Sequence, residues 1–332
     1  MRFEGDYTKS GVEFERALLF AIACALTAPA AAQTWPAQPV RLVVPYPPGG
    51  GVDYMGRLLS EKFTEQFRSS FVVDNRAGAA GTIGSGFVAK AAPDGYTLLV
   101  TAPEMAIDPS LRLNMPYNVT KDFAPISQLT SGPYILAGHP SIPVKTVKDL
   151  IALAKAQPGK LNYGSSGAGS INHLKGELLQ FMAGIRWVHV PFKGVGPAIT
   201  AVLGGEIEFV FASTTALGQH VKARKLHGIG VTGTKRFATL PDMPTISESG
   251  LPGYDVTGWY ALFAPANTPA DIVRRVHAET VRALNTPDSK EKLALTGNEP
   301  VASSPAEFAQ FLRTEIDKWA AVIKSSGIQK IE

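Results

Sequence analysis

Short apolar runs alternate with amphipathic segments along most of the chain, in the order strand, glycine-rich turn, helix. Arg41–Val44 is mostly apolar and β-branched, which is typical of a buried strand. After a proline- and glycine-rich turn, Met55, Leu58 and Leu59 recur at the spacing of one helix face, and Asp53 is placed to cap that helix or to lie in its first turn. The repeated order predicts an open, parallel α/β sheet. Further strands are predicted at residues 71–73, 96–100, 123–129, 161–163, 187–190, 207–211, 226–231 and 259–264, helices at 147–156, 271–284 and 306–325, and a loop at 108–117.

Three loops rich in glycine or small residues, Pro47–Gly51, Asn75–Gly81 and Gly164–Ser170, each lead into a predicted helix. Bare N–H groups at a helix N-terminus attract anions, because the unpaired donors and the helix dipole point the same way. Any one of these loops could equally be a tight turn without a ligand. Three of them in two halves of an α/β chain favour an anion-binding cleft. The hydroxyl groups expected there are those of Thr82, Ser165, Ser166 and Ser170.

The first residues have the pattern of a signal peptide. Ala17–Ala32 is apolar, follows a basic residue, is too short to span a bilayer comfortably, and ends in small residues suited to cleavage near Ala32. We therefore predict a signal peptide at residues 1–32, although the acidic residues before it leave open a true start downstream of Met1. The alternatives are a buried core helix and a lipoprotein anchored at Cys24. As the only cysteine, Cys24 leaves the mature chain without disulfides, thiol catalysis or cysteine-bound metal.

Composition and motif content exclude several functions. Hydrophobic residues make up 45% of the chain and charged residues 18%, and the net charge of +4 is not gathered into a basic run, so the chain is globular and nucleic-acid binding has little support. The motifs G-x-S-x-G, H-E-x-x-H and the P-loop are absent, and the six histidines lack metal-ligand spacing. Gly84–Ala89 fits G-x-G-x-x-A only loosely, and no well-placed ribose-binding acid follows it. We expect no catalytic residue, metal or cofactor.

Two candidate residues have open roles at this stage. His173, at the start of a predicted helix, could cap or pack that helix, or contact a ligand through water. Lys193, in a Pro-Phe-Lys-Gly turn, could reach an anion or remain solvated.

Ordered motifs cover nearly the whole mature chain. They are Val44–Asp53, Asn75–Gly84, Pro93–Leu98, Lys121–Ile126, Tyr163–Leu174, Pro191–Gly194, Pro241–Gly250 and Trp259–Pro265. In this order they resemble the substrate-binding proteins of tripartite tricarboxylate transporters, also called Bug proteins. No single motif is specific, but their number and order are.

The resemblance implies a two-lobed type II periplasmic-binding-protein fold with the ligand cleft between the lobes. Lobe 1 would comprise residues 33–133 and 258–332, and lobe 2 residues 134–257. A monomer in the periplasm would bind a small organic carboxylate and deliver it to the transporter membrane subunits. The implied ligand-binding positions are Tyr46, Pro48, Gly49, Gly50, Ala79, Ala80, Gly81, Thr82, Ser165, Ser166, Gly169, Ser170, His173, Phe192, Lys193, Ala212 and Ser213.

One departure from the family pattern bears on the ligand. Ala212 stands where the family commonly has an aspartate after a strand, and the preceding family aspartate appears as Glu208. Without the acid, recognition of a ligand amino group is in doubt, so we expect a non-amino carboxylate, with a dicarboxylate or an aromatic acid favoured. The alternatives are a secreted hydrolase that uses a serine or histidine of the same cleft, and a receptor used for signalling.

Overall fold

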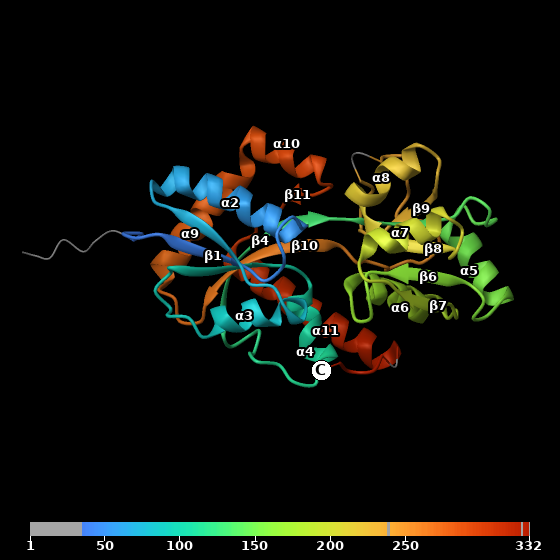
Figure 1. The fold of residues 1–332 in the computed structure, drawn as a ribbon, viewed down its shortest axis with the longest axis horizontal. Helices are drawn as coiled ribbons and strands as arrows, with labels where there is room; N and C mark the ends of the chain where they lie inside the picture. Colours follow the sequence, from blue (N-terminus) through green and yellow to red (C-terminus); the bar gives the residue numbers. More distant parts are fainter. Residues whose placement is uncertain (1–34, 238–239, 327, 332) are drawn as a thin grey trace, which may run out of the picture. The chain divides into compact units, whose positions relative to one another are not determined.

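The computed structural model describes residues 35–237, 240–326 and 328–331, so the predicted signal peptide lies outside the described residues. Everything that follows concerns the compact unit that begins at Gln38. This unit contains two β-sheets flanked by helices (Figure 1). Within the described residues, no helix is long and apolar enough to cross a membrane.

The first sheet has six strands in the order β11-β4-β10-β3-β1-β2. Strand β1 pairs in parallel with β2 and β3, whereas β10 runs antiparallel to both β3 and β4. The open, parallel sheet predicted from the first strand-helix rounds is therefore confirmed for β1, β2 and β3, whereas β10 returns late in the chain and runs in the opposite direction. The strands are β1 (Val40–Val44), β2 (Phe71–Asn75), β3 (Thr97–Thr101), β4 (Phe123–Gly132), β10 (Gly258–Pro265) and β11 (Glu299–Pro300).

The second sheet has five strands in the order β7-β6-β8-β5-β9. Strand β6 is parallel to β7 and β8, and β5 is antiparallel to β8 and β9. The strands are β5 (Tyr134–Gly138), β6 (Asn162–Ser165), β7 (Val188–Pro191), β8 (Phe209–Ser213) and β9 (His227–Val231). The chain enters this sheet directly from β4 through Pro133, which has no N–H with which to continue the first ladder, and it returns to the first sheet at β10 (Figure 1).

The helices lie between or after the strands. Figure 1 shows α2 with α9 on one side of the first sheet and α3 with α4 and α11 on the other. Helix α5 occupies the predicted residues, since Thr146 and Asp149 form a capping box at its start. The helices are α2 (Gly51–Phe67), α3 (Thr82–Ala89), α4 (Glu104–Leu111), α5 (Val147–Ala156), α6 (Ile171–Ala183), α7 (Val195–Leu203), α8 (Thr214–Lys222), α9 (Ala270–Asn285), α10 (Pro287–Leu295) and α11 (Pro305–Ser326), with a 3₁₀ turn at Ala79–Gly81.

Helix α4 corrects the prediction of a loop from residue 108. Pro109 lies inside the helix, which a sequence pattern alone treats as a break. The buried side chains of Met105, Ile107 and Leu111 belong to the main apolar cluster, and α4 packs against α11. Tertiary packing has therefore outweighed the local cost of the proline.

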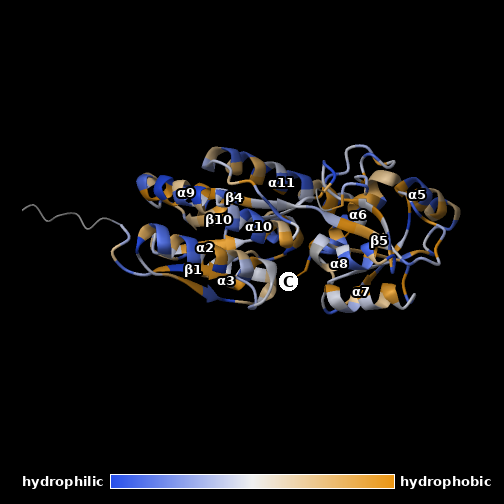
Figure 2. Ribbon diagram, turned by 90° about the horizontal axis from the view of Figure 1, so that it is seen from above, coloured by the Kyte–Doolittle hydropathy of each residue, from blue (hydrophilic) through white to orange (hydrophobic). Residues whose placement is uncertain are grey.

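The main core is continuous between the two sheets. Apolar residues lie largely on the helix faces and strands that are turned inward (Figure 2). One buried cluster includes Phe308 and Trp319 of α11 together with Leu174 and Leu178 of α6, and α11 contacts α6 directly. A smaller cluster lies beneath α7 and α8 in the second sheet. The loose G-x-G-x-x-A match lies inside α3. There Gly84 packs closely against Pro45, so packing explains why this position is a glycine.

Candidate functional site

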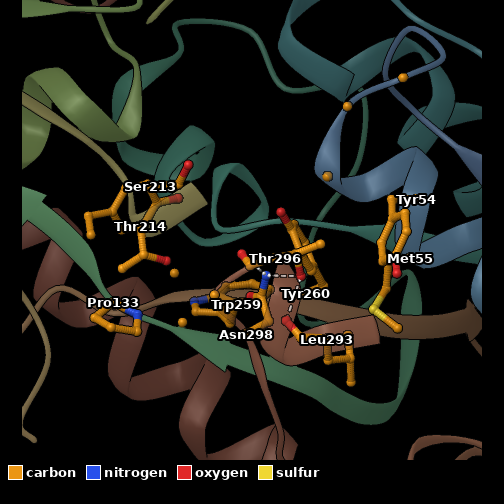
Figure 3. A pocket seen from close by; sticks show the side chains of 17 residues that line it. Tyr54, Met55, Pro133, Ser213, Thr214, Trp259, Tyr260, Leu293, Thr296 and Asn298 are labelled. Atoms are coloured by element: carbon orange, nitrogen blue, oxygen red, sulfur yellow. Dashed lines mark hydrogen bonds between the residues drawn. The ribbon is translucent and has the colours of Figure 1, made fainter. Parts of the chain in front are cut away.

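A cavity of about 330 Å³ lies where the two sheets meet (Figure 3). It receives the N-terminal ends of α2 and α8, the two segments that cross between the sheets, and the turn after α10. None of its lining side chains carries a formal charge. The lining residues are Gly49, Gly50, Gly51, Tyr54, Met55, Gly132, Pro133, Tyr134, Ser213, Thr214, Gly258, Trp259, Tyr260, Leu293, Thr296, Gly297 and Asn298.

The N-terminus of α2 reaches the cavity without a side-chain cap. Gly50 is the N-cap residue in an extended conformation, and no side chain accepts a hydrogen bond there. The first N–H groups of a helix have no intrahelical acceptor, so this end offers donors to the cavity. Residue 51 has to be a glycine, because a Cβ at this position would overlap the Tyr260 hydroxyl.

Asp53 holds this loop in place. It is only 3% exposed, and its carboxylate accepts hydrogen bonds from the Gly49 N–H, Arg57 Nε and Asn75 Nδ2, each at 2.9 Å. Burial opposes ionisation, but the bonds from Arg57, Gly49 and Asn75 prevail and lower the pKa of Asp53. The acid is thus engaged by its own partners, which limits its repulsion of an anion in the cavity.

The N-terminus of α8 contributes an unpartnered hydroxyl. Ser213 caps α8 by accepting the N–H of Ala216, at 3.3 Å. Thr214, which follows it, is 7% exposed, and its Oγ1 has no hydrogen-bond partner among the described residues. A buried hydroxyl is normally satisfied by protein or by ordered water. Thr214 therefore offers an unused donor and acceptor on the cavity wall.

Two tyrosines complete the polar lining. Burial, with a contribution from Glu104, raises the pKa of Tyr260 to about 12. Burial, then Tyr260 and Glu104, also raises the pKa of Tyr134. Both phenols stay protonated at neutral pH and can donate hydrogen bonds. The cavity is consequently supplied with amide and hydroxyl donors but with no side-chain carboxylate.

Of the predicted site residues, Gly49, Gly50 and Ser213 line this cavity. The structure brings a second group together around α4. The Tyr46 hydroxyl donates to Glu104 Oε2, at 3.1 Å, and a Cβ at Gly81 would lie 3.2 Å from that hydroxyl. Burial raises the pKa of Glu104 and also that of Tyr46.

Two more predicted loops meet α4 through its C-terminal half. The Ala79 carbonyl accepts hydrogen bonds from the Thr82 hydroxyl, at 3.0 Å, and from Arg112 Nη2, at 2.9 Å. Gly169 approaches Leu111 so closely that a Cβ would lie 2.8 Å from its Cδ2. The loops at residues 75–81 and 164–170 thus lie beside α4 and, unlike Gly49–Gly51, are not among the residues that line the cavity.

In the predicted serine loop, Ser165 and Ser170 are already engaged by partners within the loop and by His189. Ser165 Oγ lies 2.6 Å from His189 Nε2 and accepts the Gly167 N–H at 3.0 Å, and Ser170 caps α6 by accepting the His173 N–H at 3.3 Å. Because the Gly169 N–H donates to His173 Nδ1 at 3.0 Å, a neutral His173 carries its hydrogen on Nε2.

Two further contacts stabilise this network. The rings of His173 and His189 stack with centroids 3.8 Å apart, and His173 Nε2 faces Glu177 Oε1 at 3.6 Å. His173 therefore both packs and organises the loop, and the Gly169 amide is already engaged.

The remaining predicted residues vary in exposure. Ala212 is fully buried in β8. Ser166 is half-buried, and none of the hydrogen bonds of the described residues includes its hydroxyl. Phe192 is half-buried, and its N–H donates to the Ser165 carbonyl at 3.1 Å. The exposed residues are Pro48, Ala80 and Lys193.

Several residues of the site were not predicted from the sequence. Thr214 follows a predicted strand, and Tyr260 lies in a matched motif, so the sequence carries a signal for both residues. Thr296 and Asn298 follow α10, which no pattern predicted. Among the described residues, no group of three or more His, Cys, Asp or Glu side chains could hold a metal ion.

Two sheets, a chain that crosses between them, and a cavity at that junction define a two-lobed solute-binding fold. Residues 55–328 match the family model described as the tripartite tricarboxylate transporter family receptor, TctC, and the chain belongs to this family. Below, lobe 1 denotes the first sheet with α2–α4 and α9–α11, and lobe 2 the second sheet with α5–α8.

Curated relatives share most of this chain. The protein encoded in the tcbD–tcbE intergenic region of a Pseudomonas species is 36% identical over 87% of this chain and 86% of its own. BugT of Bordetella pertussis is 33% identical over 93% of this chain and 95% of its own.

Solved structures extend the comparison to the fold. An R. palustris protein with adipate has a TM-score of 0.78 and 34% identity, over 90% of this chain and all of its own. MatC of Rhodopseudomonas palustris, with bound malate, has a TM-score of 0.72 and 30% identity, over 87% of this chain and all of its own.

Proposed function

We propose that this protein is a periplasmic receptor that captures a small organic carboxylate and delivers it to a tripartite tricarboxylate-type membrane permease. The observation that carries the proposal is the convergence of the N-termini of α2 and α8, one from each lobe, on a cavity without charged side chains. Amide and hydroxyl donors at helix N-termini hold a carboxylate without needing a cation. The volume of about 330 Å³ suits a small molecule.

Binding would be coupled to closure of the lobes. We take residues 33–133 with 258–332 as one moving body and residues 134–257 as the other, with the crossings at Pro133 and Gly258 as the hinge. A ligand that contacts both helix N-termini prefers the closed state and shifts the equilibrium toward it. Such a device needs one copy of the chain, so the proposed receptor acts as a monomer.

The predicted site residues have two roles in this proposal. Gly49, Gly50 and Ser213 contact the ligand, together with Thr214. The loops at residues 79–82 and 165–170 hold α4 in place and border the cleft. Lys193, which is exposed, would reach the ligand only at the rim.

The ligand class follows from the lining and from the relatives. Adipate and malate in two structural neighbours support a carboxylate. Ala212, where the family commonly has an acid, and a lining without carboxylates disfavour an amino group. A dicarboxylate or an aromatic acid is therefore favoured over an amino acid.

The hydrolase alternative has one supporting observation, the contact of Ser165 with His189. Ser165 is completely buried, its hydroxyl also bonds within its own loop, and it does not line the cavity. A substrate carbonyl could not approach this oxygen in the arrangement described. We propose that the protein is not an enzyme, and detectable turnover of nitrophenyl esters that is lost in Ser165→Ala would overturn this.

The experiment for the receptor function is a thermal-shift screen of the mature protein, beginning at Gln33. Mono-, di- and tricarboxylates, aromatic acids and amino acids would be compared, because a ligand that binds only the folded state raises the unfolding temperature. A shift with a non-amino carboxylate is expected. No shift with any acid would contradict the receptor function, and an amino acid as the tightest ligand would contradict the ligand class.

A further inference from the structure

Lys175, on α6, is a completely buried basic side chain with an incomplete set of partners. It is 0% exposed, its Nζ donates to Asn172 Oδ1 at 2.9 Å, and Nζ lies 2.8 Å from the centroid of the Tyr134 ring. None of the ion pairs between described residues includes Lys175. An ammonium group has three donors, and burial without a carboxylate partner is costly.

Glu104 is the acid that influences the charge of Lys175, but it does not complete the set of partners of Nζ. Glu104, in lobe 1, favours the charged form of Lys175, but it lies beyond ion-pair distance and accepts a hydrogen bond from Tyr46 instead. Burial lowers the pKa of Lys175 well below its ordinary value, and the influence of Glu104 only partly opposes this. The group that would satisfy Lys175 is a further carboxylate.

Tyr134 connects Lys175 with the cavity. Tyr134 is among the lining residues and its ring contacts Nζ, whereas Lys175 itself is not among the lining residues. Tyr134 is thus the residue that contacts both the ammonium group and the cavity at the ends of α2 and α8. Rotation of this side chain would open a path from the cavity to Nζ. A ligand held at one end by the helix N-termini could then place a second anionic group beside Lys175.

We propose that Lys175 binds a second carboxylate of the ligand and makes the receptor selective for dicarboxylates over monocarboxylates of the same length. This inference rests on the proposed carboxylate-binding function and assigns a specificity-determining residue to it. Displacement of the Tyr134 ring exchanges a cation–π contact for a charge-assisted hydrogen bond, which is the stronger of the two in a dehydrated site.

The test compares matched acids by calorimetric titration. The wild-type protein would be titrated with succinate and butyrate, glutarate and pentanoate, adipate and hexanoate, and terephthalate and benzoate. In at least one pair we expect the dicarboxylate to bind about 10- to 100-fold more tightly, as expected for one hydrogen bond to a charged group. Equal affinity within every pair, or no binding in any pair, overturns the inference without any variant.

Variants then assign the selectivity to Lys175. Lys175→Met is expected to weaken the preferred dicarboxylate by about 10- to 100-fold and to leave its monocarboxylate partner within about threefold. Lys175→Arg, which keeps the charge, should retain the preference. Lys160→Met removes an exposed lysine of the same lobe and controls for long-range charge effects. If Lys175→Met does not fold, Lys175→Gln, which can keep the bond to Asn172, replaces it.

The two possible failures are distinguishable. Monocarboxylate binding by the wild-type protein without a preference overturns the role of Lys175 and leaves the receptor function intact. A dicarboxylate preference that persists in Lys175→Met likewise overturns only the role of Lys175. Absence of any response in the wider thermal-shift screen overturns the receptor function itself.

Discussion

Thr214 at the start of α8 in lobe 2 packs directly against the α-carbon of Gly297 in lobe 1. A Cβ added to Gly297 would overlap Thr214 Oγ1, and Gly297 has a φ of +72°, which side-chain-bearing residues rarely adopt. Both residues line the cavity. The close approach of the two lobes at the proposed site thus depends on the absence of a side chain at one position.

Gly297→Ala is expected to weaken ligand binding by hindering this approach. Overpacking costs about 1–3 kcal/mol, so the dissociation constant should rise roughly 5- to 150-fold if closure requires the contact. Calorimetric titration with the ligand from the screen measures the effect. Gly159→Ala is the matched control, because Gly159 has a φ of +71° with no atom within 4 Å of an added Cβ. Gly159→Ala has the same positive-φ strain without the overlap, so it should lose some stability but keep its affinity. Equal affinities for both variants would contradict the prediction.

Thr214→Val should separate binding from stability. The substitution removes a buried hydroxyl that has no partner in the structure, so the ligand-free protein should be as stable as the wild type or slightly more stable. If the hydroxyl bonds a ligand carboxylate, affinity should fall by roughly 10- to 150-fold, equivalent to about 1.5–3 kcal/mol. Thermal unfolding and titration measure the two quantities, with Thr214→Ser as the variant that keeps the hydroxyl. A loss of stability without a loss of affinity would show that the hydroxyl is structural.

Gly51→Ala is expected to destabilise the protein although alanine favours a helix. An added Cβ would overlap the Tyr260 hydroxyl, and displacement of the ring should cost about 1–3 kcal/mol. Gly50→Ala is the neighbouring control, because its Cβ would meet only the Pro47 carbonyl oxygen at 3.9 Å. Combining Gly51→Ala with Tyr260→Phe should recover part of the loss in denaturant unfolding. Equal stabilities for the Gly51 and Gly50 variants would argue against the overlap.

His189 should make the serine loop sensitive to acid. Burial, and then the neighbouring His173, lower the pKa of His189 to about 4, compared with about 6.5 in the unfolded chain. Glu177 partly opposes this lowering of the pKa of His189. Because the unfolded state binds the proton more readily, this residue stabilises the fold fully above about pH 6.5, and the contribution is lost as the pH falls toward 4.

The measurement is the unfolding temperature at pH 7.5, 6, 5 and 4.5. His189→Gln, whose amide can still reach Ser165, should be less stable than the wild type at pH 7.5 but should lose less stability on acidification. Parallel curves for the two proteins would show that His189 does not carry the acid sensitivity.

Local patterns predicted the elements whose signals lie within a few residues. Helix α5 occupies the predicted residues 147–156 because apolar spacing and the cap at Thr146 agree. The opening strand and α2 follow from the same kind of agreement. Helices α4 and α10 were not predicted: Pro109 suggested a break in the first, and the second has no strong apolar face.

The sequence by itself determined the order of strands and helices, the glycine-rich starts of the helices and the family resemblance, because each depends on neighbouring residues. Only the tertiary structure decided which donors are free. The Gly169 amide is taken by His173, and the Tyr46 hydroxyl by Glu104, whereas the Thr214 hydroxyl is left without a partner. The physical reason is that a hydrogen-bonding group is satisfied or left free by whatever folds against it, and Tyr46 and Glu104 are 58 positions apart in the chain.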